Sequence, residues 1–309
     1  MTDSPTLPSD LRTLFFCVGA QKAATTWLAE MLGRTPGCHV ARGKEMHYWT
    51  MRAEARDRDA ELAMRRRNMR RGLRDLSSAV LRGRRIRPAA EVVVRRARGL
   101  ALARDPSVER YMSRLLRGRP RGVAVAGEMT PNYATLDREW LAAMRDLHDD
   151  VRIFFVLRDP VDRLWSGIRH TRTAKADHGA EDDARLLAAF DAAIADPSDE
   201  HRRRSEYGDT IEALDATFGR DRVAYFFFDT IRTRPELDRL GDFLGVGPIP
   251  FQPERRVNPG IRAGLRPDAE AMNRARQALD HVYRFVGDRF GPAAIADWRP
   301  APVAAEVVT

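Results

Sequence analysis

Residues 14–28 read LFFCVGAQKAATTWL, and this stretch decides the fold of the 309-residue chain. An apolar run that ends at Gly19 passes through small residues into a segment with helical periodicity. A buried strand, a small-residue loop and a helix in this order are typical of an α/β domain with a parallel sheet. Lys22 lies inside the loop, and Thr25 and Thr26 open the helix. Backbone N–H groups, a helix N-terminus and a lysine together favour a bound phosphate.

Other apolar runs along the chain are typical of strands buried on both faces, and segments with helical periodicity separate them. These runs are residues 38–41, 123–127, 151–157 and 222–228. The alternation predicts an α/β, P-loop-like three-layer fold, with a central parallel sheet of about five strands flanked by helices. We expect a single domain over residues 1–309, with its last helix over 267–290. Ligands of such a sheet bind at the carboxyl ends of the strands.

The positive charge of the chain is concentrated in one segment. The chain carries 53 basic and 44 acidic side chains, a net charge of +9. Residues 51–122 hold 22 arginines and 8 acidic residues, a local +14, so the rest of the chain sums to −5. Such a segment suits a polyanion, a membrane surface or an acidic substrate, and solvated helices are the alternative.

Several classes of protein are disfavoured by the sequence. No stretch approaches the roughly 18 apolar residues of a membrane-spanning helix, and the first ten residues lack the features of a secretory signal. Cys17 and Cys38 form neither a disulfide framework nor a metal-ligand pattern. An ATP-binding loop has a glycine before its lysine and Ser or Thr directly after it, whereas Gln21 precedes Lys22 here. We therefore expect a cytoplasmic protein that needs no metal.

Residues 21–28, QKAATTWL, resemble a loop of the sulfotransferases that use 3′-phosphoadenosine 5′-phosphosulfate (PAPS). That loop reads P-K-x-G-T-T-x-L and holds the 5′-phosphosulfate. Two residues depart from the pattern, since Gln21 replaces the proline and Ala24 replaces the glycine. The second departure matters more, because a Cβ at residue 24 is strained if the loop needs a positive φ there.

Three more segments extend the resemblance. Residues 158–166, RDPVDRLWS, resemble the 3′-phosphate motif R-x-P-x-x-R-x-x-S of that family. Residues 44–49, KEMHYW, resemble a segment common in bacterial members and in the carbohydrate branch, which includes the heparan sulfate enzymes. Residues 127–133, GEMTPNY, resemble the segment after the middle strand. The resemblance leaves only the arginine-rich segment unexplained, and we expect this segment to be a helical insertion.

The resemblance implies which residues bind the donor PAPS and the product PAP. They are Lys22, Ala23, Ala24, Thr25, Thr26, Trp27, Arg158, Ser166 and a basic residue of a late loop, for which we select Arg262. Arg255, Arg256 and Arg266 are the alternatives for this last position. The fork geometry of an arginine guanidinium suits the phosphate contact expected of Arg158. Asp159 and Pro160 suit the start of the following helix.

Catalytic roles follow from the same resemblance. Lys22 is expected to neutralise the leaving 5′-phosphate, since charge stabilisation and positioning dominate this type of transfer. Glu45 matches the general base of the carbohydrate branch, and His47 is the alternative base two residues later. On a strand or extended turn, residues 45 and 47 point the same way, so we expect both to face one pocket. Glu128 ranks third, because its segment can serve only to shape the pocket.

The predicted function is transfer of a sulfuryl group from PAPS to a hydroxyl or amine of a small-molecule, saccharide or lipid acceptor. Two alternatives remain at this point, a small-molecule kinase with a degenerate P-loop and a polyanion-binding protein. Nucleic acid is not expected as a partner, because Tyr111 is the only aromatic residue in 51–122. We expect these helices to lie beside the acceptor cleft and to favour an anionic or membrane-associated acceptor, with a possible peripheral membrane contact.

Overall fold

The computed structural model describes residues 7–54, 58–83, 86–104, 106–173, 180–254 and 265–298. Within them, a five-stranded parallel sheet has the strand order β2-β3-β1-β4-β5. The strands are β1 (Thr13–Gly19), β2 (Cys38–Val40), β3 (Val125–Met129), β4 (Val151–Leu157) and β5 (Val223–Phe227). From β1 the chain crosses to the edge strand β2, returns to β3 beside β1, and then passes over β1 to β4 and β5. The switch point therefore lies between β1 and β4, where sheets of this kind bind ligands.

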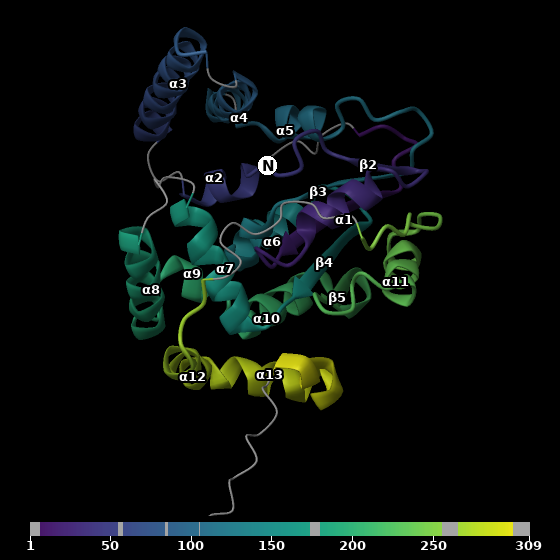
Figure 1. Cartoon of the computed structure of the whole chain (residues 1–309). Coiled ribbons are helices and arrows are strands. Elements are labelled where there is room, and N and C mark those ends of the chain that lie inside the picture. Colours follow the sequence, from purple (N-terminus) through teal and green to yellow (C-terminus); the bar gives the residue numbers. More distant parts are fainter. Residues whose placement is uncertain are drawn as a thin grey trace, which may run out of the picture.

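Helices surround the sheet, which confirms the predicted α/β fold (Figure 1). They are α1 (Thr25–Leu32), α2 (Tyr48–Glu54), α3 (Arg58–Leu81), α4 (Ile86–Arg104), α5 (Val108–Leu115), α6 (Arg138–Arg145), α7 (Pro160–Thr173), α8 (Ala180–Ala195), α9 (Glu200–Arg203), α10 (Tyr207–Phe218), α11 (Arg234–Leu244), α12 (Ala269–Ala278) and α13 (Asp280–Phe290). Short 3₁₀ turns are η1 (Pro131–Thr135), η2 (Arg220–Arg222) and η3 (Pro292–Trp298). Helix α10 packs on β4 and β5, and α13 packs against α10 as an outer layer. In the described residues, no helix has the length and apolar character needed to cross a membrane.

The apolar runs in the sequence are continuous because the central strands are buried on both faces of the sheet. All seven residues of β1 are buried, and β4 is buried at every position except Arg152. The register places Gly127 of β3 opposite Phe15 of β1. A Cβ on Gly127 would lie 2.0 Å from the carbonyl oxygen of Phe15. Only glycine therefore lets these two strands pair at this point.

Strand β3 is displaced from its predicted position at 123–127. Pairing with β1 begins at Val125, opposite Thr13, and β3 continues through Glu128 to Met129. The apolar pattern misses this end because Glu128 is a charged residue type, yet its side chain is fully buried. The shift brings Glu128 to the edge of the sheet where ligands bind.

The prediction of one helix over 267–290 was wrong, because the chain breaks into α12 and α13. Leu279 lies at the junction with φ −110° and ψ 14°, and it is buried. The change of direction lets each helix bury its own apolar face. Ala271 and Ala275 are buried on α12, while Val282 and Val286 are buried on α13.

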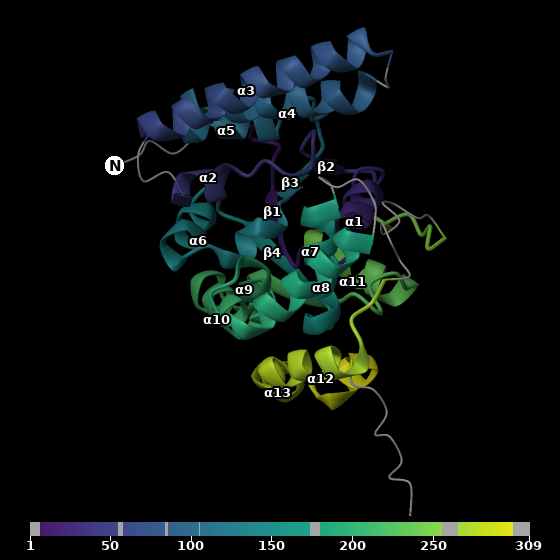
Figure 2. The same ribbon diagram turned by 60° about the vertical axis from the view of Figure 1, so that its left-hand side comes forward.

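The arginine-rich segment contributes α2, α3, α4 and α5 to the structure. Helices α3 and α4 pack on each other as a hairpin that lies across one side of the body (Figure 2). The hairpin is joined to the body through α2 and α5, where the rings of Tyr48 and Tyr111 stack at 4.2 Å between centroids. The hydroxyl of Tyr48 also donates a hydrogen bond of 2.7 Å to the carbonyl oxygen of Pro106, just before α5.

The Glu128 carboxylate connects three parts of the chain in the interior. It accepts hydrogen bonds from the hydroxyls of Tyr111, Thr130 and Tyr133 at 2.5, 2.6 and 3.0 Å. It also accepts a 2.8 Å bond from the backbone N–H of Met46. Burial raises the pKa of Glu128, and these hydrogen bonds oppose the rise. The residue thus holds the loop around Met46 and helix α5 to the end of β3.

We expect Glu128→Ala to lower the free energy of unfolding by about 3–5 kcal/mol, because it leaves several buried donors unpaired and opens a cavity. Urea unfolding followed by circular dichroism measures the change. Glu139→Ala is the control, since Glu139 is an exposed glutamate of α6, and it should change stability by less than about 0.5 kcal/mol. Equal effects of the two variants would show that the network does not stabilise the fold.

Candidate active site

A cavity of about 1410 Å³ lies at the carboxyl ends of the strands. Its walls include Gln21 after β1, Arg42 after β2, Pro131 after β3, Arg158 after β4 and Phe228 after β5. Helix α4 also lines it. Sites for one small ligand typically measure about 300–1,000 Å³. This cavity therefore has room for two reactants.

The loop after β1 adopts a left-handed conformation at two residues other than glycine. Lys22 has φ 72° and Ala24 has φ 60°. Ala24 is also the residue that precedes α1, and its side chain lines the cavity. Residue 24, where the sulfotransferase loop has a glycine, thus has a positive φ in this structure. Ala24 carries the strain that a glycine would avoid.

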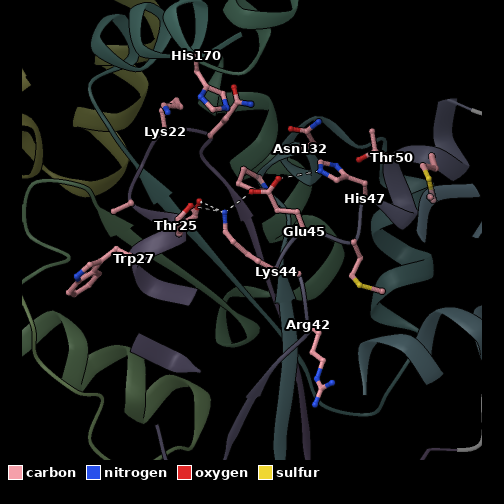
Figure 3. A pocket seen from close by; sticks show the side chains of 18 of the residues that line it. Lys22, Thr25, Trp27, Arg42, Lys44, Glu45, His47, Thr50, Asn132 and His170 are labelled. Carbon is pink, nitrogen blue, oxygen red and sulfur yellow. Dashed lines mark hydrogen bonds and ion pairs between the residues drawn. The ribbon is translucent and has the colours of Figure 1, made fainter. Parts of the chain in front are cut away.

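Most of the residues predicted in this loop reach the cavity, but Ala23 does not. Lys22, Ala24, Thr25, Thr26 and Trp27 line it, as Figure 3 shows for Lys22, Thr25 and Trp27. Ala23 is fully buried, and its backbone N–H donates to the carbonyl oxygen of Ala20 at 3.2 Å. Ala23 therefore supports the loop from beneath.

Four cations gather at the switch point, and we call Lys22, Arg158, Arg169 and Arg232 the cation cluster. Burial lowers the pKa of Lys22, and the positive charges of Arg158 and Arg169 lower it further. Burial, followed by the charge of Arg158, likewise lowers the pKa of Arg169 and of Arg232. Cations that destabilise one another in this way provide a binding site for an anion.

Arg158 is held between the loop and the end of β5. Its Nη1 donates a 2.8 Å hydrogen bond to the carbonyl oxygen of Lys22, and its guanidinium lies 4.6 Å from the ring centre of Phe228. Asp159 caps α7 by accepting from the backbone N–H of Asp162 at 2.8 Å. Ser166 lies farther along α7 and lines the cavity.

Arg163 of the same motif points away from the cavity. It is fully buried, and its Nε donates to the hydroxyl of Ser205 at 2.6 Å. Burial lowers its pKa to about 10. Arg163 thus anchors α7 to the segment that follows α9.

Trp27 closes another side of the cavity. Its indole N–H donates to the carbonyl oxygen of Gln252 at 3.1 Å, and the guanidinium of Arg232 lies 5.7 Å from its ring centre. The predicted donor residue Arg262 and its alternatives Arg255 and Arg256 fall outside the described residues. Arg266 is exposed, and its charge helps lower the pKa of Arg169.

Residues 44–47 of the KEMHYW segment form a compact loop, not the extended one we expected, and Tyr48 and Trp49 begin α2. Lys44 and His47 have φ 60° and 55°. Lys44 Nζ contacts the hydroxyls of Thr25 and Thr26 at 3.3 and 3.1 Å, and it forms an ion pair of 2.6 Å with Glu45. Figure 3 shows this lysine between Thr25 and Glu45. Lys44 therefore joins the KEMHYW loop to the loop after β1.

Glu45 and His47 lie side by side in the wall of the cavity (Figure 3). Nε2 of His47 lies 3.2 Å from Oε2 of Glu45, and both side chains are 37% exposed. Burial acts to raise the pKa of Glu45, but the hydrogen bond from His47 and the charge of Lys44 outweigh it and lower the pKa to about 2. Glu45 is therefore ionised at neutral pH and accepts a proton only weakly.

The comparison with known sequences decides the family. Residues 15–247 match the sequence profile described as the Sulfotransferase family. The chain belongs to the sulfotransferase family. Among curated proteins, no sequence matches it.

The comparison with solved structures concerns the fold. A sulfotransferase from Alicyclobacillus acidocaldarius superposes with a TM-score of 0.60 at 19% sequence identity, over 94% of this chain and 99% of that one. This likeness shows the shared fold. The sulfotransferase domain of the Synechococcus PCC 7002 olefin synthase aligns over 90% of this chain and 98% of its own length, with a TM-score of 0.45 and 15% identity.

Sequence reasoning missed several residues of this sulfotransferase that line the cavity, namely Lys44, Asn132, Arg169, His170 and Arg232. Two of them carried a signal, because Arg169 and His170 follow Ser166 by three and four residues on α7 and so share its face. Burial and the charge of Lys22 lower the pKa of His170, which favours its neutral form. Within the described residues, no group of three or more His, Cys, Asp or Glu side chains is placed to hold a metal.

We expect Ala24→Gly to stabilise the protein by about 0.5–1 kcal/mol. A left-handed conformation costs an ordinary residue about 1–2 kcal/mol, and the greater freedom of glycine in the unfolded chain offsets about 0.4–1 kcal/mol of this gain. Ala29→Gly is the matched control, because Ala29 lies inside α1, and it should destabilise by about 1 kcal/mol. Urea unfolding measures the free energy of unfolding of both variants, which should rise in Ala24→Gly and fall in Ala29→Gly. Destabilisation by Ala24→Gly would show that residue 24 is not strained.

Proposed function

We propose that this sulfotransferase transfers a sulfuryl group from PAPS to a hydroxyl or amine of an acceptor, with PAP as the other product. The observation that carries the proposal is the cation cluster at the switch point of the sheet. PAPS carries phosphate groups at two positions, and the cluster draws its cations from the loop after β1, from α7 and its preceding turn, and from the segment after β5. The family match supports the same reaction class.

The residues present fit such a donor. In the free protein Lys22 has a lowered pKa because of burial and its cationic neighbours, and a bound phosphate would relieve that repulsion. Its pKa would then rise, so donor binding takes up protons and strengthens as the pH falls. Lys22, Thr25 and Thr26 would hold the 5′-phosphosulfate, while Arg158 and Ser166 would hold the 3′-phosphate.

Bound PAPS supplies an activated sulfuryl group. Transfer breaks the S–O bond to the 5′-phosphate, forms an S–O or S–N bond to the acceptor, and releases one proton from the acceptor. Lys22 would neutralise the charge that develops on the leaving phosphate oxygen, a contribution that typically changes kcat by about 10²–10³. Lys44 bridges the two loops, and it would thereby fix the positions of Lys22, Glu45 and the two threonines relative to one another.

Glu45 and His47 are the candidates for the group that takes the acceptor's proton, and their contacts support a different role for each. A base works best when its pKa lies near the working pH, and the ion pairs of Glu45 lower its pKa to about 2. We therefore place His47 as the proton acceptor and Glu45 as the carboxylate that orients it. This assignment differs from the preference for Glu45 that the resemblance implied, and it follows from the contacts of Glu45 with Lys44 and His47.

The turnover rates of two single variants separate the two bases. His47→Gln should lower kcat by about 10²–10⁴, because it removes the group that takes the proton. Glu45→Gln should lower kcat less, because it removes only the carboxylate that orients the imidazole. A larger loss in Glu45→Gln than in His47→Gln would assign the base to Glu45. Retained stabilisation by PAP in both variants controls for folding.

Thermal denaturation with PAP tests the donor. PAP at about 100 times its Kd should add about 2.7 kcal/mol of stability, and Lys22→Met and Arg158→Met should lose most of this shift. Arg220→Met removes an exposed positive charge that does not line the cavity, and this variant should keep the shift. A larger shift with ATP and Mg²⁺ than with PAP would favour a kinase instead.

The acceptor would occupy the far part of the cavity, which the arginine-rich helices line. Arg65 of α3, Arg96 of α4 and Arg114 of α5 contribute to this wall, together with Val94. We propose an acceptor that combines a nucleophilic hydroxyl or amine with an anionic group, from the saccharide, lipid or small-molecule class. We also propose that residues 51–122 are an insertion within one domain. Supplying radiolabelled PAPS to a native extract would identify the labelled product.

A further inference from the structure

We propose that the turn end of the α3–α4 hairpin docks on an anionic lipid bilayer. The tip, which we define as Val80, Leu81 and Ile86, exposes apolar side chains where the two helices meet. Their exposed fractions are 54%, 86% and 48%. Monomeric proteins usually bury or scatter such residues, so a cluster of them at a projecting end suggests a surface that covers it.

Arginines accompany the tip on the same face of α3. Leu73 and Val80 are seven residues apart, so they lie within about 20° of each other around the helix. Arg66 lies another seven residues before Leu73, Arg70 falls on the same stripe, and Arg74 follows Arg70 by one helical turn beside it. All of these side chains are exposed. The stripe is thus basic near the start of α3 and apolar at the tip.

The uneven distribution of charge along the chain favours an orientation in which the hairpin faces an anionic surface. Residues 58–104 hold 15 arginines and 4 acidic residues, a net +11, so the rest of the chain sums to −2. An anionic surface would attract the hairpin and weakly repel the body. Figures 1 and 2 show the hairpin on the side of the molecule opposite α13, where it can meet a surface without the body in between.

Stable attachment to a membrane needs both the apolar tip and the arginines of the stripe. A modest apolar contact or a modest basic patch alone gives weak, reversible binding, whereas the two together are effective. The long aliphatic part of an arginine can also lie along the apolar region while its charged end reaches the lipid headgroups. No residue in 58–104 is aromatic, so the stacking that single-stranded nucleic acids use is absent from this part of the sequence. Duplex nucleic acid would leave the tip uncovered.

Co-sedimentation of the full chain with vesicles tests the proposal. We expect binding to vesicles of phosphatidylcholine mixed with phosphatidylglycerol, and little binding to phosphatidylcholine alone. The variant V80S/L81S/I86S should weaken partitioning by about tenfold or more, and R66Q/R70Q/R74Q should weaken it by about tenfold or more as well. The control R220Q/R222Q/R284Q removes the same charge from exposed positions of the body and should bind as the wild type does.

A second measurement reports insertion directly. Leu81→Cys offers a labelling site at the tip, since Cys17 and Cys38 are buried. A nitrobenzoxadiazole label there should brighten when mixed vesicles are added, whereas the same label on Arg220→Cys should not change. Circular dichroism of each variant confirms that it folds. Neither measurement depends on sulfuryl transfer, so failure of the proposed reaction would leave this result intact.

Three results would overturn the proposal. The first is wild-type binding by V80S/L81S/I86S, which would mean that the apolar tip takes no part. The second is no brightening of the label at residue 81. The third is tighter binding to a duplex oligonucleotide than to the vesicles at the same salt concentration, since this would assign the basic surface to nucleic acid.

Discussion

The architecture of the site depends on one buried carboxylate, that of Glu128. Its four hydrogen bonds tie the end of β3 to the KEMHYW loop through the backbone of Met46 and to helix α5 through Tyr111. A buried carboxylate without such donors would be strongly unfavourable, so the donors and the acceptor constrain each other. Glu45 and His47 on one side and the arginine-rich helices on the other are therefore positioned by the same group.

Backbone strain is concentrated in the two loops that this arrangement brings together. Lys22, Ala24, Lys44 and His47 are all left-handed, although none is a glycine. Such conformations persist only where the surrounding structure holds them, and they are typical of functional sites. Here Lys44 fixes both loops by contacting the threonines of one and Glu45 of the other. The two loops consequently act as one rigid unit.

Site residues could be predicted from the sequence where a local apolar run ends at the edge of the sheet that binds ligands. Lys22 and Arg158 were predicted because each follows a buried apolar run, and parallel strands bring such ends together. Arg232 was missed because it stands several residues beyond β5, where nothing local marks it. Glu128 was predicted only as a third candidate base, and its structural role was missed because its burial depends on donors from distant segments. Glu45 and His47 were expected to face one pocket from an extended segment, whereas they lie side by side in a loop with left-handed residues at Lys44 and His47.

The contact between Tyr48 and Pro106 has a consequence for how such a chain can change over evolution. It places the two ends of the hairpin segment next to each other, so the α3–α4 unit occupies the position of a loop. Lengthening, shortening or exchanging that unit would leave the central sheet and the stacked rings of Tyr48 and Tyr111 in place. If the acceptor binds beside these helices as proposed, substrate range can diversify by exchange of this unit, while the residues proposed to bind the donor stay under separate selection.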